Sequence, residues 1–165
     1  MFSDAALLIA TVAMVPLTLL IAYMDMRDLR IPNWSILAVF GVFLATASWG
    51  LPFDVFLWRL GYGAAAFAAG LLIYSITSGK VGAGDLKLLA ALAPFLYAGN
   101  ILGFALIYVT ASVFGLTAYL VARRIANGRT TGFKGIDTRG YYPAGVLLGL
   151  TMAATLVVNL AARFT

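Results

Sequence analysis

The sequence of 165 residues contains no cysteine, no histidine and no glutamate. Without thiols and imidazoles, the chain cannot form a disulfide, a Cys or His nucleophile, a thiolate or imidazole zinc site, or a heme ligated by His. Only 10% of the residues are charged, and all six acidic residues are aspartate. Any chemistry must therefore use Asp, Lys, Arg, Ser, Thr, Tyr or the backbone.

Apolar residues are abundant instead, at 63% of the chain, which is well above the usual content of a soluble domain. They gather in six runs, most of them near the roughly 20 residues that a helix needs to cross a bilayer. The runs are Ala5–Met24, Ser35–Gly50, Trp58–Thr77, Leu86–Ala98, Ile101–Val121 and Ala144–Ala162. The pattern predicts an all-α integral membrane protein, a bundle of about six transmembrane helices that forms one domain over residues 1–165.

Basic residues predict the orientation of this bundle. Eleven Lys and Arg against six Asp give a net charge of +5. Nine of the eleven fall on one side of the membrane: Arg27, Arg30, Lys80, Lys87, Arg123, Arg124, Arg129, Lys134 and Arg139. Arg59 and Arg163 fall on the other. Because cytoplasmic loops are enriched in Lys and Arg, we expect loops 25–34, 78–85 and 122–143 in the cytoplasm and both termini outside it, in a plasma (inner) membrane. The first run lacks a basic region before it and should remain as a membrane anchor.

The fourth run is short, because its thirteen residues rise only about 20 Å along a helix. A glycine-rich segment precedes it, and we expect residues 79–85 to form a yielding loop partly submerged in the bilayer. Asp85 stands at the mouth of this helix. Its simplest interpretation is an N-cap, since Asp accepts hydrogen bonds from the free amides there.

Asp25 follows the first run and should lie at the same boundary. An acidic residue at a helix C-terminus opposes the helix dipole, so capping does not explain it, although a solvated charge beside Arg27 does. Asp28 lies between Arg27 and Arg30, where a local ion pair is expected. Pro32 then forces a break before the next helix.

Two carboxylates at equal depth suggest a mechanism. If they lie a few ångströms apart they cannot both ionise easily, so one can hold a proton while the other acts as a base. This is the arrangement of an aspartic peptidase, in which the charged partner activates a water and the protonated partner assists the peptide carbonyl. Neither a metal nor a cofactor is needed.

Two motifs carry a resemblance to a known family. The first places Asp25 seven residues before the Pro of Ile31-Pro32-Asn33, and the second is the run Gly82-Ala-Gly84-Asp85-Leu-Lys87-Leu88. Together they resemble the type IV prepilin peptidases, membrane aspartic peptidases of the GxGD type. By this resemblance Asp25 and Asp85 form the catalytic pair, and Gly82, Gly84, Lys87, Pro32 and Asn33 bind substrate or shape the site.

The resemblance also implies the reaction. Longer relatives carry a cytosolic region with paired Cys motifs and methylate the new N-terminus. This chain has neither the length nor the cysteines for that region, so it resembles the short, peptidase-only branch that serves tight-adherence (Flp-type) pili, and no methyltransferase activity is expected. Its substrates would be prepilin or pseudopilin precursors with a short basic leader, a glycine before the cleavage point and an apolar helix in lipid. Asp28 and Asp137 are candidates for contact with the leader. No nucleic acid partner is expected.

Other functions stay open at this stage. Acids at membrane depth also build proton pathways, so the main alternative is a small proton-coupled transporter or channel subunit. A lipid-head-group transferase would need clustered acids for Mg²⁺, and a structural assembly subunit would tolerate loss of both aspartates. The small residues of 61–70, Gly145 and Gly149 are assigned to helix packing.

Overall fold

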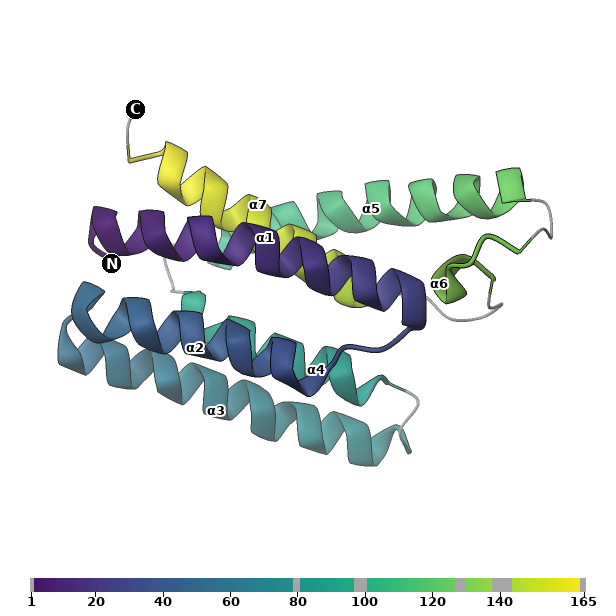
Figure 1. Ribbon diagram of the computed structural model, residues 1–165. Helices are drawn as coiled ribbons and strands as arrows, with labels where there is room; N and C mark the ends of the chain where they lie inside the picture. Colours follow the sequence, from purple (N-terminus) through teal and green to yellow (C-terminus); the bar gives the residue numbers. More distant parts are fainter. Residues whose placement is uncertain (1, 79–80, 97–100, 127–129, 138–143, 164–165) are drawn as a thin grey trace.

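The computed structural model describes residues 2–78, 81–96, 101–126, 130–137 and 144–163, and in this part of the chain it contains helices, short connections and no strand (Figure 1). The elements are α1 (Asp4–Asp28), α2 (Asn33–Gly50), α3 (Phe53–Ile76), α4 (Ala83–Leu92), the 3₁₀ turn η1 (Ala93–Phe95), α5 (Ile101–Ala126), α6 (Lys134–Asp137) and α7 (Ala144–Ala161). The prediction of an all-α membrane protein is confirmed. Expectations that concern Gly79, Lys80, Asn100, Asn127, Arg129 and Arg139 lie outside the described residues.

Five of the helices are long and apolar enough to cross a membrane, namely α1, α2, α3, α5 and α7. The fourth apolar run forms only the ten residues of α4, about 15 Å of helix, followed by η1. The predicted helix Leu86–Ala98 was therefore displaced: the helix begins at Ala83, and the backbone is already extended at Leu96. Pro94 explains the early end, because it has no N–H to continue the hydrogen-bond ladder.

Local sequence signals set the helix boundaries. The Ser3 hydroxyl caps α1 by accepting a hydrogen bond from an amide of its first turn. At the other end Leu29 adopts the left-handed conformation, with φ 53°, and donates its N–H to the carbonyl of Asp25. Pro32 and Pro52 precede α2 and α3 in extended conformation, where a residue without N–H costs nothing.

The helices form two groups that meet through the contacts of α1 with α2 and of α4 with α7: one holds α1, α5, α6 and α7, and the other holds α2, α3, α4 and η1. α1 packs against α7 on one side and α2 on the other, whereas α3 packs mainly on α4 and η1. α5 lies at the edge of the bundle against α7 (Figure 1). A cluster of aromatic rings joins the groups near the chain termini, where Phe43 contacts Phe95 edge to face at 5.4 Å between centroids and Phe2 stacks on Phe95 at 6.4 Å.

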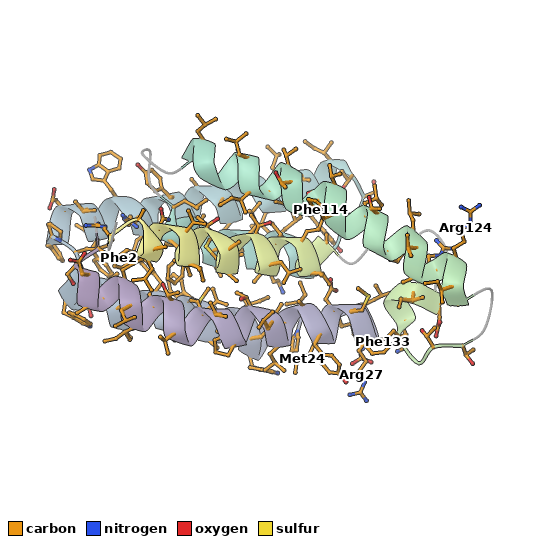
Figure 2. The ribbon with its side chains drawn as sticks, turned by 90° about the horizontal axis from the view of Figure 1, so that it is seen from above. Phe2, Met24, Arg27, Phe114, Arg124 and Phe133 are labelled. Carbon is orange, nitrogen blue, oxygen red and sulfur yellow. The ribbon has the colours of Figure 1, made fainter. Side chains whose placement is uncertain are left out.

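Charged residues mark the two ends of the bundle. Both termini lie at one end (Figure 1). There Arg163 pairs with Asp4 at 3.3 Å, and the buried Arg59 donates to the carbonyls of Pro94 and Phe95. Arg27 and Arg124 lie at the opposite end (Figure 2). The described helix ends beside the loops that the sequence places on one side of the membrane thus lie at one end of the bundle (Figure 1).

Candidate active site

Asp25 lies on the buried face of α1, with 5% of its surface exposed. It continues a stripe of buried residues at spacings of three and four: Leu7, Thr11, Met14, Thr18 and Ile21. Because this spacing maps onto one face of a helix, the carboxyl group points into the bundle. Its burial does not fit the interpretation of Asp25 as a solvated charge.

Asp85 lies in the first turn of α4 and is half-buried. The residue before the helix is Gly82, in extended conformation, and no side chain caps it. The interpretation of Asp85 as an N-cap was therefore wrong, since it is the third residue of the helix. The prediction of a loop over residues 79–85 was also wrong for the last three of them, which are helical. An acidic residue in the first turn favours helix there through the dipole.

The two carboxylates converge at the end of the bundle away from the termini. Both line a cavity of about 700 Å³, and the charge of Asp85 acts on Asp25. We call this space the aspartate cavity. It is lined by Met24, Asp25, Asp28, Leu29, Arg30, Ile31, Pro32, Asn33, Gly82, Ala83, Gly84, Asp85 and Lys134. Its size is that of pockets that bind ligands.

The two positions of the second motif that hold glycine exclude a side chain for different reasons. A Cβ on Gly82 would lie 2.6 Å from Oδ2 of Asp85, so this glycine gives the carboxylate its room. A Cβ on Gly84 would lie 3.3 Å from the Cβ of Ile31, so this glycine lets α4 approach the connection between α1 and α2. Both line the aspartate cavity.

Pro32 and Asn33 form one border of the cavity, and Lys87 contacts this border from outside. Pro32 and Asn33 line it at the start of α2, and Oδ1 of Asn33 accepts a hydrogen bond of 3.3 Å from Nζ of Lys87. Lys87 is exposed and does not line the aspartate cavity. It links α4 to α2 beside the carboxylates.

The two other acids near this end differ from each other. Asp28 is exposed and lines the cavity, but the expected ion pair with its arginine neighbours is absent, since the salt bridge found among the described residues joins Arg163 to Asp4. Asp137 accepts hydrogen bonds from the backbone N–H of Thr131 at 3.0 Å and from its hydroxyl at 2.9 Å. These bonds hold the pKa of Asp137 below its ordinary value. Asp137 thus closes its own turn instead of facing the cavity.

Part of the loop 122–143 folds back onto α1. Phe133 meets Tyr23 edge to face, with 6.2 Å between ring centroids (Figure 2 labels Phe133 beside the end of α1). The next residue, Lys134, begins α6 and lines the aspartate cavity. The sequence did not single out this lysine, because nothing local distinguishes it from the other basic residues of the loop.

The N-terminus of α7 brings backbone amides to both carboxylates, at a glycine that the sequence pattern assigned to helix packing. The backbone amides of Gly145 and Val146 act on the carboxyl group of Asp25, and the amide of Gly145 also acts on Asp85. A helical signal existed: Gly145 shares a face with the buried residues Gly149 and Met152. That signal predicts burial, but only the pairing of α7 with α1 places this face against Asp25.

The described residues contain no group of three or more acidic residues that could hold a metal ion. What the site offers is a pair of carboxylates, neighbouring backbone amides and a cavity that opens at the end of the bundle. Such a set is suited to proton transfer to and from a bound molecule.

Comparison with known proteins gave one family. The model of the type IV leader peptidase family matches residues 12–120, which include Asp25, Asp85 and most of α1 to α5. The search of curated proteins and that of solved structures gave no match. The match covers more than half of the chain, and the apolar helices make the protein a multi-pass membrane protein. By these residues the chain belongs to the type IV leader peptidase family.

Proposed function

We propose that the protein is an aspartic endopeptidase that removes the leader from prepilin-type precursors at the cytoplasmic face of the membrane. The family supports a peptidase in general. The observation that carries the finer assignment is the convergence of Asp25 and Asp85, from two different helices, on one cavity. Two interacting carboxylates can share one proton, which provides a base and an acid in the same site.

The reaction follows from this pair. The charged carboxylate takes a proton from a water molecule, whose oxygen attacks the carbonyl carbon of the scissile peptide bond. The protonated carboxyl group donates to the carbonyl oxygen, which stabilises the tetrahedral intermediate. When the C–N bond breaks, a proton passes to the leaving amine and the pair returns to its starting state. The pair titrates as a unit, so the two roles belong to it jointly.

The substrate would approach from the cytoplasm. The aspartate cavity opens at the end of the bundle that carries most of the described basic residues, and the positive-inside rule assigns such an end to the cytoplasm. A leader peptide on this side reaches the cavity directly. Asp28 is exposed on its border and is the acid available to a basic leader, since Asp137 is engaged by Thr131.

An apolar groove beside the aspartate cavity is the site that we propose for the apolar helix of the substrate. It has a volume of about 510 Å³ and is lined by Asn33, Ile36, Leu37, Phe40, Leu60, Gly63, Ala64, Phe67, Lys87, Ala90 and Ala91. Asn33 lines both the groove and the aspartate cavity, so the groove starts where the cavity ends. In a prepilin-type precursor the apolar helix follows the cleavage point, and a helix seated here would begin beside the carboxylates.

A bulky residue in the groove tests this placement. Ala64 is exposed in the groove and Ala65, also exposed, lies outside it. Ala64→Phe should raise KM about tenfold for a precursor that keeps its apolar helix and leave cleavage of a short peptide around the cleavage point unchanged. Ala65→Phe should affect neither substrate. Equal kinetics of the two variants on the full precursor would exclude the groove as the helix site.

The transporter alternative is less well supported. All six acids of the chain lie in the described residues. The two that are buried or half-buried, Asp25 and Asp85, lie at the same end of the bundle. A proton pathway built on acids needs them at successive depths, and no acid of this sequence lies in the middle of a membrane-spanning helix.

The decisive experiment is cleavage of a prepilin-type precursor by purified protein, followed as a loss of leader-sized mass. Asp25→Asn and Asp85→Asn should each abolish cleavage while the protein still inserts, because either change removes half of the shared-proton pair. Asp28→Asn should retain activity within about tenfold. Turnover at the wild-type rate by either of the first two variants would refute the aspartic mechanism.

A further inference from the structure

The start of α7 faces both candidate catalytic carboxylates. Gly145 is the second residue of this helix, and its N–H acts on Asp25 and on Asp85, whereas that of Val146 acts on Asp25. The first N–H groups of a helix have no partner within the helix, and together they carry partial positive charge. An amide between two carboxylates can interact with either one as the proton moves between them.

The approach of the carboxylate requires a residue without a side chain. A Cβ on Gly145 would lie 2.9 Å from Oδ2 of Asp25 and 2.6 Å from Cδ1 of Ile31. The terminal methyl of Ile31 can rotate away. The Asp25 side chain has little freedom to do so, because it is 5% exposed. Any side chain at position 145 would thus displace the carboxylate or α7 itself.

The oxygen nearest to Gly145 has a further property. Oδ2 of Asp25 is buried and has no partner at hydrogen-bond geometry among the described residues. The amides of Gly145 and Val146 therefore form no hydrogen bond with this oxygen. This oxygen keeps its capacity to hold a proton, while the amides limit where the group can lie.

We infer that Gly145 is a positioning residue, whose amide and missing side chain hold Asp25 and Asp85 in the geometry that lets them share a proton. The inference rests on the proposed peptidase function and adds α7, which lies beyond the family match at residue 120, to the active site. Glycine is required here by the close approach of a carboxylate, since the helical conformation itself suits any residue.

Gly149 provides a matched control on the same helix. A Cβ there would lie 2.9 Å from the backbone carbonyl oxygen of Thr18, so Gly149→Ala disturbs the same α1–α7 contact one turn away from the carboxylates. If Gly145 serves packing alone, the two alanine variants should behave alike. If it positions the carboxylates, they should differ in kinetics.

The experiment compares kcat, KM and the pH profile of cleavage for wild type, Gly145→Ala and Gly149→Ala, each normalised to folded protein in detergent. We expect Gly145→Ala to lose kcat by roughly hundredfold, as for a misplaced catalytic group, with KM little changed and the pH profile displaced. Gly149→Ala should yield less folded protein, but the kcat and pH profile of that protein should match the wild type.

A double variant separates the two short contacts of Gly145. Ile31→Val removes the methyl that a Cβ at position 145 would meet, so Gly145→Ala in this background conflicts with Asp25 alone. This double variant also tests the inference if Gly145→Ala alone fails to accumulate in the membrane. We expect kcat to stay low relative to Ile31→Val. Recovery of kcat in the double variant, or a pH profile like that of the wild type, would overturn the inference. Absence of cleavage by the wild type would instead refute the proposed function.

Discussion

At the scale of residues, the two carboxylates occupy unlike environments. Asp25 is buried in the last turns of a long helix beneath the start of α7, whereas Asp85 is half-buried in the first turn of α4. Unlike environments are what allow two chemically identical groups to take the roles of acid and base. The glycines beside them determine where each carboxylate can lie, Gly82 for Asp85 and Gly145 for Asp25.

Gly82 offers a direct test at this scale. Gly82→Ala would place a Cβ 2.6 Å from Oδ2 of Asp85, although the backbone of Gly82, with φ −60° and ψ 123°, accommodates alanine. We expect cleavage to fall by roughly tenfold or more with little change in thermal stability, because the carboxylate must move but the fold need not.

Gly61→Ala is the matched control, since a Cβ there has nothing within 4 Å. It should leave cleavage unchanged. If Gly82→Ala cleaves at the same rate as Gly61→Ala, the position of the Asp85 carboxylate does not limit the reaction.

At the level of single elements, the turn that ends in α6 brings a described part of the loop 122–143 to the cavity. Asp137 closes the turn by accepting from Thr131, Phe133 rests on Tyr23, and Lys134 lines the aspartate cavity. The turn therefore couples the stability of a short loop segment to the shape of the cavity border.

This coupling predicts a pH dependence. Because the hydrogen bonds from Thr131 lower the pKa of Asp137, its stabilising effect is complete above the ordinary value of 3.8 and is lost as the pH falls through the lowered, folded value. Asp137→Ala should increase protease cleavage within 130–137 at neutral pH, and the difference from wild type should disappear in strong acid. Asp54→Ala, which changes an exposed acid on α3, is the control. Equal proteolysis of the two variants at neutral pH would contradict the role of Asp137.

At the scale of the whole molecule, the distribution of charge and the position of the cavity point to the same side. Arg27 and Arg124 lie at the end of the bundle where the aspartate cavity opens, opposite the chain termini (Figure 2). If this end faces the cytoplasm, as the positive-inside rule predicts, the cavity also opens to the cytoplasm. A leader peptide that never crosses the membrane can then reach it.

Single cysteines test this orientation, and the absence of native cysteine leaves no background labelling. Ser78 is exposed just after α3, and Asp54 is exposed at the start of the same helix. A cysteine at Ser78 should react with a membrane-impermeant thiol reagent only after the cytoplasmic side is opened, whereas one at Asp54 should react in intact cells. The reverse pattern would place both carboxylates on the outer side.

The helical membrane class and the two motifs follow from the sequence alone. Apolar runs of membrane length leave the backbone no satisfactory state in lipid except the helix, so composition and length were enough. The short fourth helix was also predictable, because the run has too few residues to span, although its boundaries were not. They depend on Pro94 at one end and on the favourable first turn around Asp85 at the other.

The groups that surround the carboxylates depend on the packing of distant helices. Gly145 and Lys134 are more than a hundred residues from Asp25 along the chain, and nothing in their local sequence indicates that they meet it. Their positions follow from the packing of α7 and α6 on α1. Local sequence limits the conformation of each segment, but the contact between distant segments is determined by the fit of whole helix faces, which a single sequence does not reveal.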